Sequence, residues 1–167
     1  MNTFDNLSLI AAIGCKNELG MDGHLIWKIP DDLKFYREMT LGKFIIMGRK
    51  TFETMPYGAL DGRKPIILSS KNLDDYFDVS CFNNVEQLLN FVSMTPEEFM
   101  VVGGAKVYEE LLPYVKTMYL TKIMKNHRAD AYFPLFNESE WNRELMLKAL
   151  GKKPPCVRYC YTRKLKK

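Results

Sequence analysis

Two adjacent acids, Asp31 and Asp32, follow a proline in the stretch LIWKIPDDLKFYREM at residues 25–39. Pro30 favours the first turn of a helix, where a backbone N–H has no intrahelical partner to lose. In such a helix Asp31 lies on the polar side, whereas Asp32 shares its face with the residues three, four and seven positions later. These residues are apolar: Phe35, Tyr36 and Met39. The spacing therefore predicts a carboxylate at the head of an apolar stripe.

A carboxylate on an apolar helix face is costly unless another group pairs with it. The residue types alone leave two interpretations of Asp32 open. In the first, Asp32 is an acid in the first turn, where the helix dipole favours negative charge. In the second, it is a buried acid that binds a cationic or amidine-like group of a ligand.

Glycine follows a buried strand and precedes a helix at two places, FIIMGRKT (44–51) and FMVVGGAKVY (99–108). Glycine lets a ligand approach the backbone, and a helix start offers N–H groups with partial positive charge. Cations and hydroxyls that suit phosphate accompany these junctions and a third strand end: Arg49, Lys50, Thr51, Ser69, Ser70 and Lys106. Three such ends indicate a dinucleotide across the carboxyl edge of the sheet. Because G-x-G-x-x-G is absent from the sequence, the standard Rossmann arrangement is disfavoured.

Strands and helices alternate through most of the chain, which predicts parallel strands, and the last three strands follow one another without a clear helix, which predicts an antiparallel edge. We expect one α/β domain with a mixed, mostly parallel sheet of about eight strands and about four flanking helices. The expected strands cover 7–14, 43–48, 64–70, 78–82, 98–104, 117–123, 143–150 and 157–165. Besides the Asp32 helix, the expected helices cover 49–55, 84–93, with Asn84 as cap, and 105–115. Residues 15–27 are expected to form a loop.

The 167-residue chain has a formal net charge of +4, and five of its 24 basic residues lie within the last ten positions. We interpret this basic end as a solvated, charge-protected strand end; contact with nucleic acid is the alternative. No apolar run approaches the roughly 18 residues of a membrane span, and we find no signal peptide. The four cysteines form no CxxC pair and the two histidines lack metal-ligand spacing. These patterns predict reduced thiols, no metal and a cytoplasmic protein.

Several motifs occur together in one order: SLIAAIG, GMDGHLIW, IPDDL, IIMGRKTFE, GRKPIILSS, VVGGAKVYEELLP, MYLTKI and DAYFP. This set resembles dihydrofolate reductase of the bacterial type, from about Ser8 to the C-terminal strand. The resemblance implies NADPH-dependent reduction of 7,8-dihydrofolate to tetrahydrofolate, by hydride transfer to pterin C6 and water-mediated protonation of N5, as part of one-carbon metabolism. It further implies a monomer that binds dihydrofolate and antifolate inhibitors, with no nucleic-acid or membrane partner.

The resemblance also assigns roles near the substrate. Asp32 would hold the pterin N3 and 2-amino group, Thr121 would hydrogen-bond Asp32, and Arg63 would bind the α-carboxylate of the glutamate tail. Trp27 would fix a water, and Tyr108 would lie near the nicotinamide; from the residue types alone, both aromatics could equally be core. The backbone carbonyls of two residues would face the pterin edge, and three side chains would line the pocket: Ile10 and Val102, then Phe35, Met55 and Leu60.

For the cofactor, the resemblance implies that Arg49 and Ser70 bind the 2′-phosphate of NADPH. The Gly103–Gly104 bond would be a cis peptide, and residues 43–95 would form an adenosine-binding subdomain. The complete set of implied cofactor residues is Ala12, Leu19, Gly20, Met21, Gly48, Arg49, Lys50, Thr51, Ser69, Ser70, Val102, Gly103, Gly104, Ala105, Lys106, Val107 and Tyr108.

The chain departs from the family pattern in two segments. Residues 20–27 match a mobile lid, one conformation of which Asp130 would stabilise by accepting from the lid backbone. In this lid Ile26 replaces the common proline, and Gly23 adds freedom. Residues 56–61 hold one residue more than many bacterial relatives, and Tyr57 stands where a basic residue often assists the glutamate tail.

Three other interpretations are weighed against this one. A pyrimidine reductase of riboflavin synthesis would share the fold but should lack the W-x-x-P-x-D helix. A non-catalytic pterin- or nucleotide-binding module would bind without turnover. An RNA-binding protein would use the basic end, although no arginine-aromatic repeat supports it.

Overall fold

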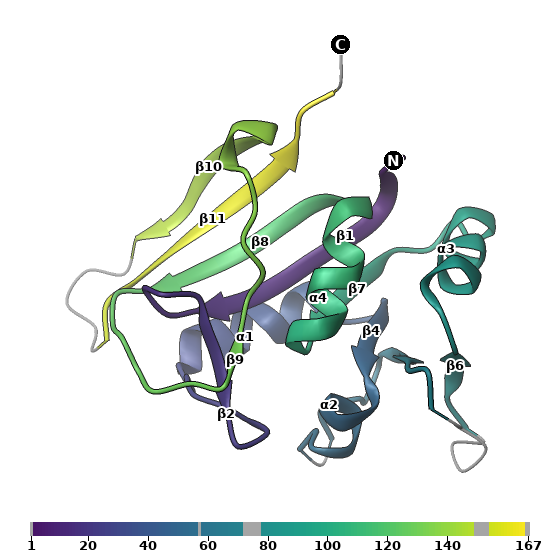
Figure 1. The fold of residues 1–167 in the computed structure, drawn as a ribbon, viewed down its shortest axis with the longest axis horizontal. Coiled ribbons are helices and arrows are strands. Elements are labelled where there is room, and N and C mark those ends of the chain that lie inside the picture. The colour runs from purple at the N-terminus through teal and green to yellow at the C-terminus, as the bar shows by residue number, and fades with distance from the viewer. Residues whose placement is uncertain (1, 57, 72–77, 149–153, 166–167) are drawn as a thin grey trace.

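The central element of the fold is an eight-stranded sheet of strand order β10-β11-β8-β1-β7-β4-β5-β6 (Figure 1). The structure is a computed structural model that describes residues 2–56, 58–71, 78–148 and 154–165. The strands from β8 to β6 pair in parallel, whereas β11 and β10 are antiparallel, which confirms the expected mixed sheet. The strand bounds are β1 Phe4–Ile13, β4 Phe44–Gly48, β5 Lys64–Leu68, β6 Ser80–Phe82, β7 Phe99–Gly103, β8 Val115–Ile123, β10 Trp141–Lys148 and β11 Cys156–Arg163.

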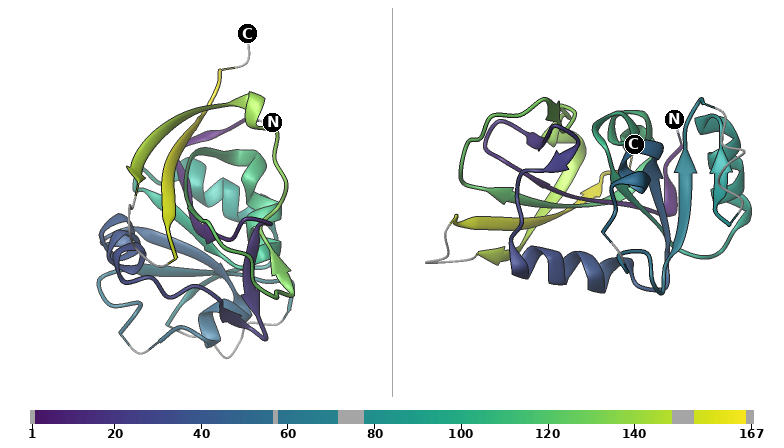
Figure 2. Two further views of the ribbon diagram at one scale, coloured as in Figure 1. Left: turned by 90° about the vertical axis from the view of Figure 1, so that its left-hand side faces the viewer. Right: turned by 90° about the horizontal axis from the view of Figure 1, so that it is seen from below.

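Four α-helices flank this sheet within the described residues, as expected. They are α1 Pro30–Thr40, α2 Arg49–Glu53, α3 Val85–Met94 and α4 Ala105–Leu111, and two short 3₁₀ turns cover Leu112–Tyr114 and Glu138–Glu140. Helix α1 lies on the opposite side of the sheet from α3 and α4 (Figure 2). The Asn84 side chain accepts a hydrogen bond from the Gln87 N–H and so caps α3, as its sequence predicts.

A second, three-stranded sheet occupies much of the segment that we expected to be a loop, so that expectation was wrong. Its strands are β2 Glu18–Met21, β3 His24–Leu25 and β9 Ala131–Tyr132, in the order β3-β2-β9. Asp22 and Gly23 join β2 to β3, with φ of 51° and 76°. Positive φ at both central positions is the geometry of a hairpin turn, for which Asp-Gly is a strong signal. The Asp-Gly pair was a local signal of this hairpin, but the hairpin was not predicted, because its strands of four and two residues are too short to show an alternating pattern.

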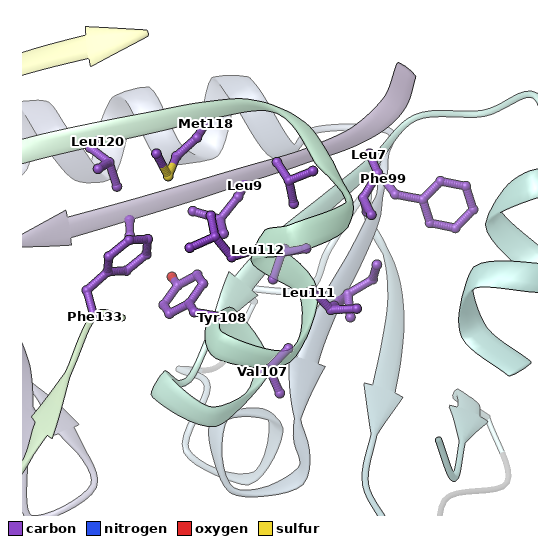
Figure 3. Packing of buried hydrophobic residues seen from close by; sticks show 14 of the residues in the cluster. Leu7, Leu9, Phe99, Val107, Tyr108, Leu111, Leu112, Met118, Leu120 and Phe133 are labelled. Atoms are coloured by element: carbon purple, nitrogen blue, oxygen red, sulfur yellow. The ribbon is translucent and has the colours of Figure 1, made fainter. Parts of the chain in front are cut away.

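Buried side chains fill both faces of the central sheet. On the α4 face, residues from β1, β8 and α4 pack around Phe133 (Figure 3). On the α1 face, a smaller cluster centres on four buried residues: Ile10, Ile45, Met47 and Met100. The apolar stripe of α1 packs against this smaller cluster, as its periodicity predicts. Sheet burial thus fixes the position of α1, and with it the position of Asp32.

The basic C-terminal end is less solvated than we expected. Arg158 is only 6% exposed. The guanidinium of Arg163 lies over the Trp141 ring and donates to the carbonyl oxygens of Val115 and Leu112. Both arginines belong to β11, so the interpretation of a charged, solvated end is wrong for them. The two arginines are five positions apart and so lie on opposite faces of the strand, and charge counting does not reveal that both faces are covered there.

Other expectations from composition can be examined over the residues that the structure describes. All four cysteines are free thiols. No cluster of metal-ligating side chains occurs there, and no helix in that part of the chain is long and apolar enough to cross a membrane.

Candidate active site

Three neighbouring strands bring one residue each to the same row of the sheet. In the strand register, Thr121 of β8 lies opposite Ala12 of β1 on one side and Arg158 of β11 on the other. Helix α1 places Asp32 against this row. The Asp32 Oδ1 atom accepts hydrogen bonds from Thr121 Oγ1 at 2.6 Å and from Arg158 Nη2 at 3.1 Å. The predicted contact between Thr121 and Asp32 is therefore present.

The Asp32 side chain is 19% exposed, so it is largely removed from water but still reachable. Its charge is matched by Arg158, which sequence reasoning missed as a site residue. Arg158 lies on the same strand face as Cys156 and Cys160, midway between them, because side chains alternate along a strand. An arginine alone on a strand face that otherwise carries cysteines was a signal that Arg158 has a partner inside the protein. That Asp32 is this partner could be learned only from the register of β11 against β8.

Several predicted substrate residues belong to one apolar cluster on the α1 face of the sheet. Phe35, Met55, Leu60 and Val102 are partly buried and pack against the cluster that contains Ile10. The Phe35 ring meets the Tyr119 ring edge-on and lies 3.8 Å from the Arg158 guanidinium carbon. The result is an apolar surface with one carboxylate at its edge, which suits a planar heterocycle that carries hydrogen-bond donors.

Tyr108 of α4 is buried, and its hydroxyl donates to the Ile10 carbonyl oxygen at 2.8 Å. Burial raises the pKa of Tyr108, and the nearby Tyr36 and Asp32 raise it further, so the hydroxyl stays protonated near pH 7. The Gly103–Gly104 bond is cis, as predicted. A Cβ at Gly103 would lie 3.4 Å from the Tyr108 ring, and φ of 124° at Gly103 also favours glycine.

The lid segment is attached to the rest of the molecule at several points. Asp130 Oδ2 accepts from the backbone N–H of Asp22 at 3.0 Å, which confirms the predicted contact. The Asp130 N–H in turn donates to the Gly20 carbonyl oxygen. Trp27 meets the His127 ring edge-on, and its Nε1 atom is buried with no hydrogen-bond partner among the described residues. A buried, unpartnered indole N–H is suited to hold a water.

Glu18, at the base of the lid, is a second residue that sequence reasoning missed. It is only 2% exposed, and its two carboxylate oxygens accept from the backbone N–H groups of Lys16 and His127. Burial alone would raise the pKa of Glu18, but backbone hydrogen bonds and Lys16 outweigh it, so the pKa lies below its usual range. This carboxylate joins the lid base to the 125–130 segment.

Arg63 is held by three acceptors at the C-terminal end of α1. Its Nε donates to Thr40 Oγ1 at 2.8 Å, and its two terminal nitrogens donate to the carbonyl oxygens of Asp61 and Arg37. These bonds fix the plane of the guanidinium before any ligand arrives. Tyr57, which stands where a basic residue often assists the glutamate tail, lies outside the described residues.

The two glycine junctions lie at the carboxyl ends of β4 and β7, where α2 and α4 begin. Their N-cap residues are Gly48 and Gly104, which offer no side chain to the first helical turn. A Cβ at Gly48 would lie 3.3 Å from Val107, and one at Gly104 would lie 3.3 Å from Thr51 Oγ1. The backbone is therefore close-packed at both junctions, as glycine permits.

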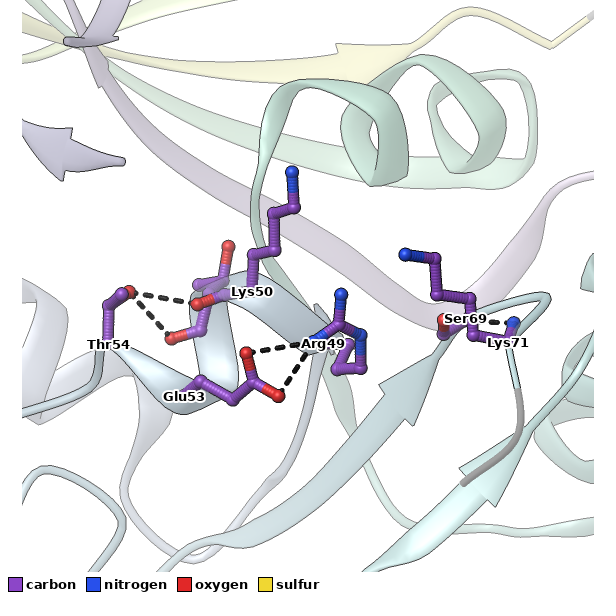
Figure 4. Close-up of polar contacts among 7 residues, drawn as sticks. Arg49, Lys50, Glu53, Thr54, Ser69 and Lys71 are labelled. Carbon is purple, nitrogen blue, oxygen red and sulfur yellow. Dashed lines mark hydrogen bonds and ion pairs between the residues drawn. The ribbon is translucent and has the colours of Figure 1, made fainter. Parts of the chain in front are cut away.

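Polar side chains surround the first junction (Figure 4). Arg49 Nη1 donates to both carboxylate oxygens of Glu53, at 2.8 and 2.9 Å. Ser69, at the end of the neighbouring strand β5, accepts from the Lys71 N–H through its hydroxyl. Lys71 is an exposed cation at the edge where a phosphate was predicted. It was not among the predicted cofactor residues. At the second junction, Lys106 pairs with Glu110.

The remaining predicted cofactor residues extend from one junction to the lid. Ala12 and Leu19 lie on β1 and β2, with Gly20 and Met21 following Leu19 on β2. Ala105 and Val107 lie in the first turn of α4. Lys50, in α2, and Ser70, two residues after β5, are exposed. All of these residues belong to strand ends or helix starts on one edge of the molecule, or to the lid beside it.

Comparisons with known proteins agree with this geometry. The family model for dihydrofolate reductase matches residues 6–157. Dihydrofolate reductase of Bacillus subtilis is 37% identical over 135 residues, which are 81% of this chain and 79% of that protein. The Haemophilus influenzae enzyme is 36% identical over 137 residues, which are 82% of this chain and 84% of that protein.

A solved structure is similar over nearly the full length. It is dihydrofolate reductase from Enterococcus faecalis complexed with NADP(H) and RAB-propyl, with a TM-score of 0.83 and 27% identity, and the match covers 98% of this chain and 99% of that one. The chain therefore belongs to the dihydrofolate reductase family, whose members are oxidoreductases of folate metabolism that use NADPH.

Proposed function

We propose that this chain reduces 7,8-dihydrofolate to 5,6,7,8-tetrahydrofolate with NADPH, with hydride transfer to pterin C6 and protonation of N5 through water. The observation that carries the proposal is the Asp32 carboxylate, which is 19% exposed, is held by Thr121 and lies on the helix face whose apolar residues pack against the sheet. A fixed carboxylate beside an apolar surface binds a ring that presents two adjacent N–H donors, such as the pterin N3 and 2-amino group.

The other substrate contacts follow from the same pocket. Phe35, Met55 and Leu60 would contact the pterin and p-aminobenzoyl rings through apolar surface. The Ile10 and Val102 carbonyls would face the pterin edge. Arg63 would bind the glutamate α-carboxylate, because a guanidinium whose plane is already fixed loses little freedom on forming a bidentate pair.

The residues at the sheet edge fit NADPH. Their donor set consists of guanidinium, ammonium and hydroxyl groups on two adjoining strand ends, and the close-packed glycines leave the backbone accessible there. Arg49, Ser70 and Lys71 would hold the 2′-phosphate. Lys50, Thr51, Gly104 and Lys106 would serve the pyrophosphate, and Ala12 and Leu19 would meet the nicotinamide carboxamide. When bound, NADPH supplies the hydride from C4 of its nicotinamide ring.

The chain's own contribution to the chemistry is to orient the two rings, exclude water and place charge. Asp32 would favour the protonated pterin electrostatically, without direct contact with N5. Trp27 would hold a water through its buried Nε1. Tyr108, a neutral hydroxyl fixed on the Ile10 carbonyl, would lie near the nicotinamide and stabilise developing positive charge. The lid, held by Asp130, would exclude bulk water from the rings.

The direct test is the oxidation of NADPH, followed by its absorbance, with and without 7,8-dihydrofolate. We expect oxidation only with dihydrofolate, with one tetrahydrofolate formed for each NADPH consumed. Binding of both ligands without turnover would instead identify a non-catalytic module and contradict the proposal. Replacement of NADPH by NADH should lower kcat/KM, since only the 2′-phosphate distinguishes the two cofactors.

A further inference from the structure

The pterin-binding carboxylate of the proposed function is already paired with a cation of this chain. Arg158 Nη2 lies 3.1 Å from Asp32 Oδ1, and Arg158 Nε donates to Thr121 Oγ1 at 3.0 Å. Thr121 Oγ1 itself donates to the same Asp32 oxygen. The three side chains therefore form a closed ring of hydrogen bonds. Both bonds to Asp32 reach Oδ1, and neither uses Oδ2.

This pair is distinct from the chain's surface ion pairs because it is buried. The Arg158 side chain is 7% exposed, whereas the side chains of Lys34 and Glu38, which pair on the outer face of α1, are 73% and 63% exposed. A desolvated pair interacts through a medium that screens charge poorly. Arg158 also stacks on Phe35, at 3.8 Å, so the residue touches two groups that line the proposed pterin pocket. The charge of Arg158 therefore acts on any ring that binds in the proposed pterin pocket.

Among the described residues, Arg158 is the cation that pairs with Asp32. Tyr108 of α4 interacts with Asp32, and Tyr36 lies on the same helix as Asp32. Burial raises the pKa of both tyrosines, so both are neutral near pH 7. Arg158 therefore offsets part of the negative charge of Asp32.

A carboxylate whose charge is partly offset by a guanidinium treats neutral and cationic rings differently from a lone carboxylate. A neutral ring with two N–H donors needs only hydrogen-bond acceptors, and Asp32 still provides them. A protonated ring gains its affinity largely from ion pairing, and here it also meets the guanidinium of Arg158. We propose that Arg158 is a specificity-determining residue that biases the pterin pocket toward neutral 2-amino-4-oxo heterocycles and against protonated 2,4-diamino heterocycles. This inference rests on the proposed function for the location of the heterocycle.

The test uses two probes that differ in one group, 2,4-diamino-5-benzylpyrimidine and 2-amino-5-benzylpyrimidin-4-one. Their dissociation constants are measured by titration of the NADPH-bound protein at pH 6 and pH 8. In Arg158→Met, which keeps an apolar stem over Phe35, we expect the affinity ratio of diamino to oxo probe to rise about tenfold or more, because an adjacent cation has been removed. Arg158→Lys keeps the cation, and we expect its ratio to stay within about threefold of the parent.

Two further variants keep the test decisive. Arg158→Gln is neutral but keeps a donor, so it replaces the Met variant if that variant does not fold, and it should raise the ratio in the same way. Arg143→Met removes a guanidinium that stacks on Tyr159 from the neighbouring strand β10, and this exposed change should leave the ratio unchanged. An equal loss of affinity for both probes in the Met and Gln variants, or an unchanged ratio, would overturn the proposal.

Failure of the proposed function is detected separately. The probe ratio is a binding measurement and reports on Arg158 whether or not the protein turns over dihydrofolate. A parent protein that does not oxidise NADPH with dihydrofolate contradicts the function, whereas an active parent with a ratio insensitive to Arg158 contradicts only the role of this arginine.

Discussion

Asp32 is held by side chains 89 and 126 residues away in sequence, whereas Arg49, at the other end of the proposed site, is held by Glu53 within the same short helix. The first arrangement is largely buried, and the Glu53 side chain of the second is 41% exposed. Asp32, on α1, is fixed by hydrogen bonds from β8 and β11 and therefore has one geometry. Arg49 is held by a local, exposed ion pair and can exchange its partner Glu53 for a phosphate. We therefore expect the heterocycle end to control turnover and the phosphate end to control affinity.

Removal of the Asp32 charge is the strongest test of whether the heterocycle end controls turnover. Asp32→Asn should lower kcat/KM for dihydrofolate by about 100-fold or more, because an amide cannot favour the protonated pterin. NADPH affinity, measured by fluorescence titration, should change less than about twofold, since the phosphate end is untouched. Turnover close to that of the parent would refute the role of Asp32.

Arg63 tests whether a fixed cation outside the reacting centre acts on affinity alone. Arg63→Met should raise KM for dihydrofolate about tenfold with little change in kcat, because a bidentate carboxylate contact is lost equally in the ground and transition states. The matched control is a substrate without the tail, 6-methyl-7,8-dihydropterin, whose kinetics should be the same with both proteins. A similar loss with both substrates would mean that Arg63 acts by supporting α1 through Thr40.

How far the sequence alone leads also differs between the two ends. The periodicity of residues 32–39 places Asp32 on a buried helix face, and the glycine junctions mark the phosphate edge; both are local signals, and both predictions of local structure are confirmed. Arg158 was instead counted with the charged tail. Its burial depends on the antiparallel register of β11 with β8, a long-range pairing that no local pattern encodes. Glu18 was missed for a similar reason, because one of its donors lies 109 residues away.

At the phosphate end, a matched pair of variants tests whether the local ion pair competes with the cofactor. Arg49→Met should raise KM for NADPH about tenfold and leave that for NADH nearly unchanged, because only NADPH offers a 2′-phosphate. Glu53→Gln should lower KM for NADPH by about twofold, because an exposed ion pair is weak and its removal frees Arg49. Equal effects of Arg49→Met on both cofactors would place the 2′-phosphate elsewhere.

The smallest effect concerns the base of the lid beside the heterocycle end. Glu18→Gln should lower Tm at pH 7 by about 3 °C, because an amide offers one acceptor oxygen where two backbone N–H groups need one each. The pKa of Glu18 is lowered by folding, so its stabilisation is complete above the usual glutamate range and is lost as the pH falls through the lowered value.

The Tm difference between parent and variant should therefore shrink as the pH is lowered from 7 toward 3. At low pH the Glu18 carboxylate of the parent becomes protonated and is then neutral, as the amide of the variant is at every pH. Glu109→Gln, an exposed glutamate of α4, is the control and should shift Tm by less than about 1 °C at every pH. A constant difference across the pH range would show that Glu18 acts by packing alone. A shrinking difference would mean that the base of the lid depends on an ionised carboxylate, one of whose partners lies 109 residues away in sequence.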